Sequence, residues 1–122
     1  MLRETIEGGS DHTSNRFARG EEVFADPGEA IGFIDRLHET KARDGFSVLA
    51  WALMSNHFHL ALRASAVPLP RTMHDLQNGF SRTFNRRWRR TGPLWQSRYK
   101  AKLIQRVSPG AVWCGFWLQR QP

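Results

Sequence analysis

Two neighbouring segments in the middle of the chain constrain its fold more than any others. Residues 46–54 are almost all apolar, which is typical of a strand buried on both faces. Residues 57–63 then alternate between apolar and polar side chains, as in a strand with one covered face. Ser55 and Asn56, between the two segments, are residues that favour turns. The sequence therefore predicts a β-hairpin whose second strand directs Phe58 and its apolar neighbours into a core.

The same alternation places His57 and His59 side by side on the polar face of the second strand. Side chains two residues apart on one strand face are roughly 6.5–7 Å apart, so both imidazoles can reach one divalent cation. Two ligands leave a site incomplete, and a third must come from elsewhere in the fold, from substrate or from water. Histidines that are solvated, or hydrogen-bonded to neighbours, would produce the same pattern.

Helical signals flank the hairpin on both sides. Asp26, Pro27 and Glu29 form a helix start, and the helix is expected to reach about Arg43. Its predicted core face consists of Ile31, Ile34 and Leu37. A second helix is predicted over residues 71–90, with an apolar stripe that steps by three or four residues: Met73, Leu76, Phe80, Phe84 and Trp88.

Further strands are expected at residues 12–17 and 98–104, which completes the order β-α-β-β-α-β. This order predicts an α+β, ferredoxin-like fold, with both helices on one face of an antiparallel sheet. The other face stays open, and His57 and His59 are expected to point to it. The domain is predicted to span residues 11–104, after a poorly ordered segment at residues 1–10.

Positive charge is concentrated in the second half of the chain. The net charge is +7, but residues 71–106 alone carry ten Lys or Arg and one acid, Asp75. Such a concentration is typical of a surface for a polyanion, and the interleaved aromatic rings favour nucleic acid, although a solvated helix face is the simpler alternative. The residues predicted to contact DNA are Arg82, Arg86, Arg87, Arg89, Arg90, Arg98, Lys100 and Trp95.

Two compositional features bear on location. Cys114 is the only cysteine, which excludes an intramolecular disulfide and fits a reducing cytoplasm. The sequence has no run of about 18 apolar residues, so no membrane span is expected.

Four segments, taken in order, resemble a known family of enzymes. Together they are similar to the HUH single-tyrosine transposases of the insertion-sequence type, including the REP-associated tyrosine transposases. The similarity covers about residues 11–104. The segments are residues 15–24, residues 54–59 (Met-Ser-Asn-His-Phe-His), residues 80–87 (Phe-Ser-Arg-Thr-Phe-Asn-Arg-Arg) and residues 92–100 (Gly-Pro-Leu-Trp-Gln-Ser-Arg-Tyr-Lys).

The resemblance implies a chemistry and a set of partners. Members of the family cut and join single-stranded DNA, often at hairpins, by attack of a tyrosine on a phosphodiester bound to a metal ion. By resemblance, His57 and His59 are the two histidine ligands of a Mg²⁺ or Mn²⁺ ion. Relatives act as monomers or homodimers, and in a dimer a helix can be supplied by the second molecule.

The chain departs from the family after residue 104. The family carries its tyrosine on a helix there, whereas residues 105–122 contain no tyrosine. We interpret this tail as the product of a truncation or frameshift that removed the nucleophile. Tyr99 is the only tyrosine, and alternation predicts that it faces away from Lys100 and the metal face.

The sequence thus predicts a transposase-like, DNA-binding protein with a catalytic defect and no identifiable catalytic tyrosine. Two alternatives remain open at this point. One is a non-enzymatic module that binds single-stranded or hairpin DNA. The other is a ferredoxin-like interaction domain that binds neither DNA nor metal.

Overall fold

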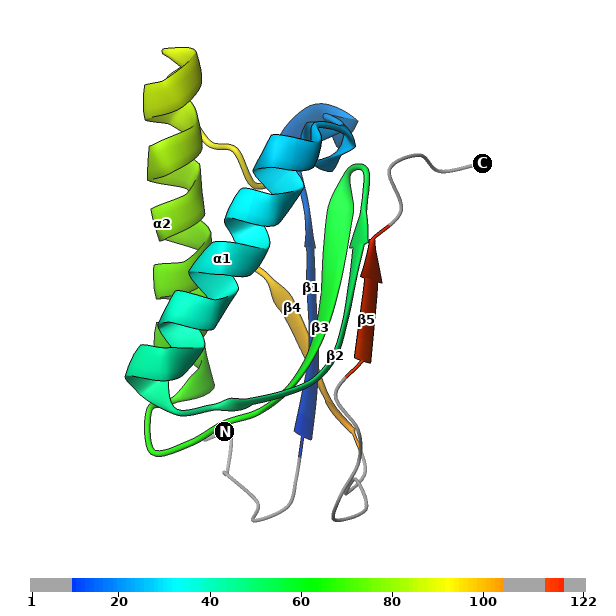
Figure 1. The fold of residues 1–122 in the computed structure, drawn as a ribbon, viewed down its shortest axis with the longest axis vertical. Coiled ribbons are helices and arrows are strands. Elements are labelled where there is room, and N and C mark those ends of the chain that lie inside the picture. Colours follow the sequence, from blue (N-terminus) through cyan, green and yellow to red (C-terminus); the bar gives the residue numbers. More distant parts are fainter. Residues whose placement is uncertain (1–9, 105–113, 118–122) are drawn as a thin grey trace.

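A sheet covered by two helices on one face organises the molecule (Figure 1). The computed structural model describes residues 10–104 and 114–117. The strands run in the order β4-β1-β3-β2-β5, and the first four pair antiparallel, which confirms the predicted ferredoxin-like arrangement. The elements are β1 (Ser10–Arg16), α1 (Pro27–Asp44), β2 (Ser47–Met54), β3 (His57–Arg63), α2 (Leu69–Trp88), β4 (Lys100–Ile104) and β5 (Cys114–Trp117), with short 3₁₀ turns at Ala18–Gly20 and Val23–Ala25.

The structure adds two features at the edges of the predicted domain. Ser10, assigned to a poorly ordered terminus, is fully buried as the first residue of β1, where it pairs with Ile104. The strand β5, which pairs parallel with β2, was not predicted. Its pairing partner lies far away in the sequence, so no local pattern indicates the contact. The rest of the expectation for residues 1–10 and 105–122 falls outside the described residues.

Helix α1 begins and ends where its residues require. The side chain of Asp26 accepts a hydrogen bond from the backbone N–H of Gly28 at 2.8 Å, and Gly45 ends the helix with a positive φ of 82°. Its core face differs from the prediction, because Ile31 is 57% exposed. The apolar residues buried on this helix are Ala30, Phe33 and Leu37, so Leu37 lies in the core as predicted, whereas the stripe before it is displaced by one position and Ile34 is only partly buried.

Helix α2 buries most of its predicted stripe but not the last member. Met73, Leu76, Phe80 and Phe84 are buried, as expected. Trp88 is 51% exposed, since the last turn of α2 meets a carboxylate instead of apolar surface, and its indole N–H donates to Glu29 at 2.8 Å. Neither helix combines the length with the apolar character that crossing a membrane requires.

The segment between α2 and β4 completes the core and overturns one expectation. Trp95, predicted to contact DNA, is 9% exposed and stacks on Phe17 with ring centroids 4.5 Å apart. Its indole N–H donates to the backbone oxygen of Gln77 at 3.0 Å. An isolated bridge between Phe17 and Trp95 holds this segment beside the end of β1. Trp95 is therefore a core residue, and its ring is not presented for stacking on a base.

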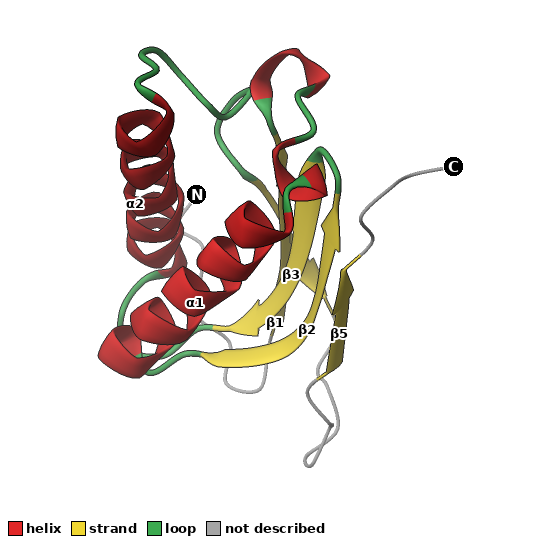
Figure 2. Ribbon diagram, turned by 45° about the horizontal axis from the view of Figure 1, so that its top comes forward, coloured by secondary structure: helices red, strands yellow, loops and turns green. Residues whose placement is uncertain are grey.

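Figure 2 shows the consequence for the site. Helices α1 and α2 lie on the same side of the curved sheet, and the opposite side is not covered by either helix. Phe58, Leu60 and Leu62 are fully buried on the helix side of β3. The residues that alternate with them stand on the open face.

Candidate metal and nucleic-acid site

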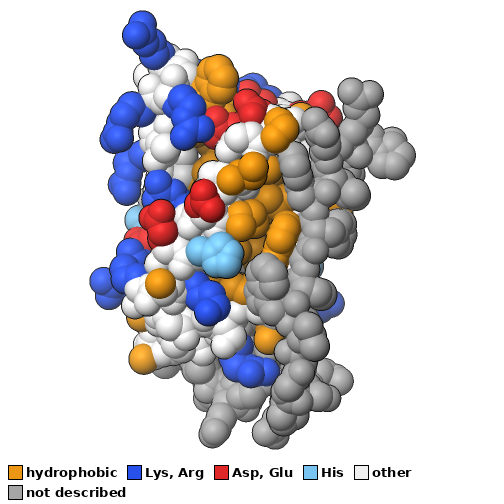
Figure 3. All heavy atoms as spheres, in the orientation of Figure 1, with side chains coloured by type: hydrophobic (Ala, Val, Ile, Leu, Met, Phe, Trp, Pro, Cys, Tyr) orange, Lys and Arg blue, Asp and Glu red, His pale blue; other side chains and the backbone are white. Residues whose placement is uncertain are grey.

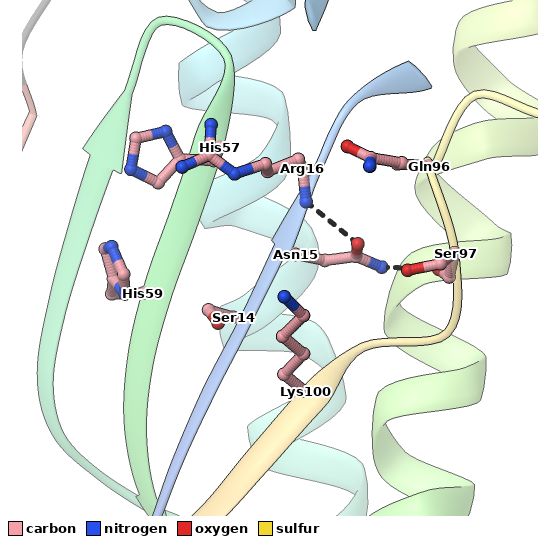
Figure 4. Close-up of a pocket in the computed structure, with 8 residues that line it drawn as sticks. All are labelled: Ser14, Asn15, Arg16, His57, His59, Gln96, Ser97 and Lys100. Carbon is pink, nitrogen blue, oxygen red and sulfur yellow. Dashed lines mark hydrogen bonds between the residues drawn. The ribbon is translucent and has the colours of Figure 1, made fainter. Parts of the chain in front are cut away.

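Three adjacent strands bring one set of polar side chains together on the open face. In the β1–β3 pairing, Arg16 lies opposite His57 and Ser14 lies opposite His59. Ser14 also pairs with Lys100 of β4, so all these side chains share a face. They line a cleft of about 210 Å³, drawn in Figure 4, whose full lining is Ser14, Asn15, Arg16, His57, His59, Gln96, Ser97 and Lys100.

His57 and His59 lie side by side in this cleft, as the alternation predicts. Their ring centroids are 5.1 Å apart and the ring planes are nearly perpendicular, at 87°. Burial lowers the pKa of His57, and the charges of Arg16 and His59 lower it further. The pKa of His59 is lowered by burial first and then by His12 and Arg16. Both rings are therefore held in the neutral form that can bind a metal ion.

Each of the two rings already uses its Nδ1 atom in a hydrogen bond. Nδ1 of His57 lies 2.7 Å from the side-chain oxygen of Asn56. Nδ1 of His59 lies 3.0 Å from Nε2 of His12, and these two rings stack with centroids 5.1 Å apart. The atom left to each ring for a ligand is Nε2.

The donor set fits a divalent ion that keeps part of its ligand shell elsewhere. Mg²⁺ and Mn²⁺ prefer oxygen ligands, so with two imidazoles as the protein ligands water or phosphate oxygens would fill most positions of such an ion. In the part of the chain that the structure describes, no three His, Cys, Asp or Glu side chains are placed to hold a metal ion. Of the sources that the sequence left open for a third ligand, a His, Cys, Asp or Glu side chain is therefore not found among these residues.

Two cations stand beside the histidines. Lys100 was predicted to contact DNA and lines the cleft, whereas Arg16 was not predicted although it also lines it. Asn15 holds the side of the cleft opposite the histidines in place. Its side-chain amide nitrogen donates to the backbone oxygen of Ser97 at 2.8 Å and to the side-chain oxygen of Gln77 at 3.0 Å. The sequence could have identified Arg16. Side chains alternate along the predicted first strand, and in a ferredoxin-like sheet this strand lies directly beside the strand that carries the two histidines.

The arginines of α2 form a separate surface. Lys and Arg side chains follow the edge of the molecule over α2 in Figure 3, while the histidine cleft lies on the sheet face that α2 does not cover. Arg82, Arg86 and Arg89 are exposed, and among the described residues none of them forms an ion pair. We call these three residues the basic row.

The other two predicted arginines of this helix end are held by carboxylates. Arg87 donates to Glu29 at 2.7 Å, and the Glu29 side chain is only 4% exposed. Arg90 forms two hydrogen bonds with Glu21, one of them 2.8 Å long, and lies over the ring of Phe84 at 5.2 Å. Both side chains therefore have a structural partner that the sequence did not reveal.

Arg98 and Tyr99 face a second cleft, between α2 and the segment before β4. This cleft has a volume of about 560 Å³, and Ser97 lines both clefts. Tyr99 packs against the hydrophobic core and does not line the histidine cleft. Its position agrees with the expectation that the only tyrosine faces away from the metal face.

Known proteins share this architecture. A REP-associated tyrosine transposase, solved bound to a REP hairpin, superposes with a TM-score of 0.69 at 14% identity, and the match covers 88% of this chain. The chain spans 62% of the length of that protein. A candidate transposase from Deinococcus radiodurans R1 superposes with a TM-score of 0.66 at 19% identity, over 85% of this chain and 82% of the other.

Sequence comparison is more specific than these distant structural matches. No curated protein is similar enough in sequence to match the chain. The sequence profile of the family described as "Transposase IS200 like" matches residues 18–113, which is most of the chain and includes both histidines of the cleft. The chain therefore belongs to the family of IS200-like transposases.

Proposed function

We propose that this chain binds single-stranded or hairpin DNA and places one backbone phosphate in the histidine cleft. The observation that carries the proposal is the convergence of two neutral imidazoles with Arg16 and Lys100 in one polar cleft. Cationic side chains beside a metal-binding pair are suited to a phosphate group. The solved transposase that this fold resembles is bound to a hairpin, which supports the same class of ligand.

Within this proposal each group has a defined part. His57 and His59 hold a Mg²⁺ or Mn²⁺ ion through Nε2, and the bound ion supplies Lewis-acid polarisation of the phosphate. Arg16 and Lys100 neutralise the charge of the DNA backbone at the cleft. The basic row, on α2 and at its C-terminal end, contacts backbone phosphates outside the cleft, because its guanidinium groups are exposed and form no ion pair within the described residues.

Binding is tested by fluorescence anisotropy of a labelled hairpin carrying a single-stranded extension, titrated over a range of salt concentrations with and without Mn²⁺. We expect affinity that falls steeply with salt and rises when Mn²⁺ is added. Replacing both cleft histidines (His57→Ala/His59→Ala) should remove the Mn²⁺ effect and leave most of the salt-dependent binding.

His74→Ala is the matched control, since His74 lies on α2 and does not line the histidine cleft. It should behave as the wild type. Binding that ignores salt would contradict the proposed phosphate contacts, and the absence of hairpin binding would favour the ferredoxin-like interaction domain that binds neither DNA nor metal. An Mn²⁺ effect that survives the loss of both cleft histidines would contradict their role as ligands.

We further propose that these 122 residues bind DNA without cutting it. The sequence contains one tyrosine, and Tyr99 packs against the core on the side of α2. A covalent intermediate needs a nucleophile positioned at the phosphate, which Tyr99 is not. A homodimer of the same sequence adds only a second copy of Tyr99.

A further inference from the structure

We propose that Asn56 and His12 are positioning residues, which set the tautomers of the two cleft histidines so that both Nε2 atoms carry a lone pair. The inference rests on the proposed metal-assisted function and extends it to two residues outside the His-Phe-His segment. Both contacts involve Nδ1 of a cleft histidine, and the two partners come from different elements, the turn before β3 and the strand β1.

The tautomer of His57 follows from the chemistry of its partner. The atom 2.7 Å from Nδ1 is the carboxamide oxygen of Asn56, which can only accept a hydrogen bond. Nδ1 of His57 must therefore carry the proton. In a neutral imidazole the other nitrogen is then an acceptor, so Nε2 presents its lone pair.

The contact between His59 and His12 is compatible with two proton arrangements, because either ring nitrogen can donate. If His12 donates, Nε2 of His59 carries a proton and cannot bind a metal ion. If Nδ1 of His59 donates to Nε2 of His12, Nε2 of His59 is free to act as a ligand. Because a ring nitrogen that carries a proton cannot bind a metal ion, the proposed metal site requires the second arrangement, in which Nδ1 of His59 donates to His12.

The backbone makes His12 a fixed partner. His12 lies on the inner strand β1, where it pairs with Ala61 of β3 on one side and Lys102 of β4 on the other. Its ring lies nearly parallel to the ring of His59, at 16°, so the contact combines a hydrogen bond with stacking. Partners of this kind orient metal-binding histidines and raise their basicity, and losing one typically lowers metal affinity 10–100-fold.

The first test needs neither metal nor DNA. In the metal-free full chain with ¹⁵N-labelled histidine, long-range ¹H–¹⁵N correlation spectra distinguish protonated from unprotonated ring nitrogens. We expect His57 and His59 both to carry the proton on Nδ1. Predominant protonation of Nε2 in either ring of the wild type would overturn the proposal.

Variants then assign the effect to the partners. Asn56→Ala removes the acceptor for His57 but keeps the backbone oxygen of residue 56, which accepts from the N–H of Phe17 at 3.0 Å. His12→Leu removes the acceptor for His59. Each should raise the share of Nε2–H tautomer in its own partner ring, and His12→Gln, which keeps an acceptor oxygen, should restore the wild-type pattern. Unchanged tautomers in both variants would overturn the assignment.

Metal affinity supplies the second measurement. In Mn²⁺ titrations the dissociation constant should be 10–100-fold larger for Asn56→Ala and His12→Leu than for the wild type. His12→Gln should bind Mn²⁺ with near-wild-type affinity, and the control His74→Leu should show no change. If the tautomers are as proposed but Mn²⁺ does not bind the wild type, the proposed function fails and the tautomer assignment stands. If Mn²⁺ binds the wild type and both partner variants equally, the positioning role fails.

Discussion

Single side chains at the end of α2 differ in what they can offer a ligand, although they look alike in sequence. Arg86 and Arg89 are exposed, whereas their neighbours Arg87 and Arg90 are tied to Glu29 and Glu21. A guanidinium that already neutralises a protein carboxylate releases fewer counterions from DNA when it approaches a phosphate. The basic row should therefore carry most of the electrostatic contribution of this helix to binding.

The basic row gives the first prediction. Replacing Arg82, Arg86 or Arg89 singly with Gln should weaken hairpin binding and flatten its salt dependence, by a slope of roughly 0.7–0.9 for each phosphate that is no longer neutralised. The measurement is the anisotropy titration over several salt concentrations. Arg87→Gln is the matched control, and its smaller effect on the slope would separate the two sets. Equal effects of all four changes would contradict the distinction.

Arg90 provides a prediction on pH. Its hydrogen bonds to Glu21 hold the pKa of that carboxyl below its ordinary value. The ion pair therefore stabilises the fold at pH values above the ordinary pKa of a glutamate side chain. This stabilisation is lost as the pH falls through the lowered pKa of Glu21. In Arg90→Met, the pKa of Glu21 should rise, and the loss of stability on acidification should be smaller than in the wild type.

Carboxyl carbon shifts followed by NMR titration report the pKa of Glu21, and urea unfolding at several pH values reports the stability. Arg89→Met is the control, because Arg89 forms no ion pair among the described residues. A Glu21 pKa that is the same in Arg90→Met and in the wild type would show that the ion pair is not populated in solution.

At the scale of elements, the segment between α2 and β4 matters most for the site. It contributes Leu94 and Trp95 to the core, and its backbone is joined to the end of β1 by the hydrogen bond from Gln96 to Arg16 at 2.8 Å. It also carries Ser97, which lines both clefts. The backbone oxygen of Ser97 accepts a hydrogen bond from the side chain of Asn15 at 2.8 Å. Packing of this segment therefore determines the shape of the wall opposite the histidines.

Trp95 is the residue through which this packing can be tested. Trp95→Ala should lower the free energy of unfolding by about 3–5 kcal/mol, because a buried aromatic ring is replaced by a cavity. Urea unfolding measures this loss. Trp88→Ala, at a half-exposed position, should cost much less. If Trp95→Ala left stability unchanged and only weakened DNA binding, Trp95 would be a base-stacking residue and not a core residue.

For the whole molecule, the separation of Tyr99 from the histidine cleft leads to a prediction about activity. Incubated with Mn²⁺ and labelled hairpin DNA, the chain should give no covalent protein–DNA band on a denaturing gel. The reason is geometric, since Tyr99 packs on the helix side of the sheet and the histidines stand on the open side. A band that disappears in Tyr99→Phe would show that Tyr99 does reach the phosphate.

Local patterns were enough to predict the hairpin, the order of the first six elements and the side of β3 on which His57 and His59 lie. These features depend on periodicities of two or about 3.6 residues, which can be read within a few residues of sequence. For the same reason Lys100 could be placed with the open face, and Tyr99 with the covered one.

What the tertiary structure alone decided are the contacts between residues that are distant in the chain. His12 meets His59 across 47 positions, and Arg87 and Arg90 meet their carboxylates across 58 and 69. The same holds for Trp95. From the sequence its ring could stack on a base of DNA or pack in the core, and its contact with Phe17 places it in the core. A local periodicity gives the direction of a side chain, but its partner depends on which strand or helix the fold places beside it.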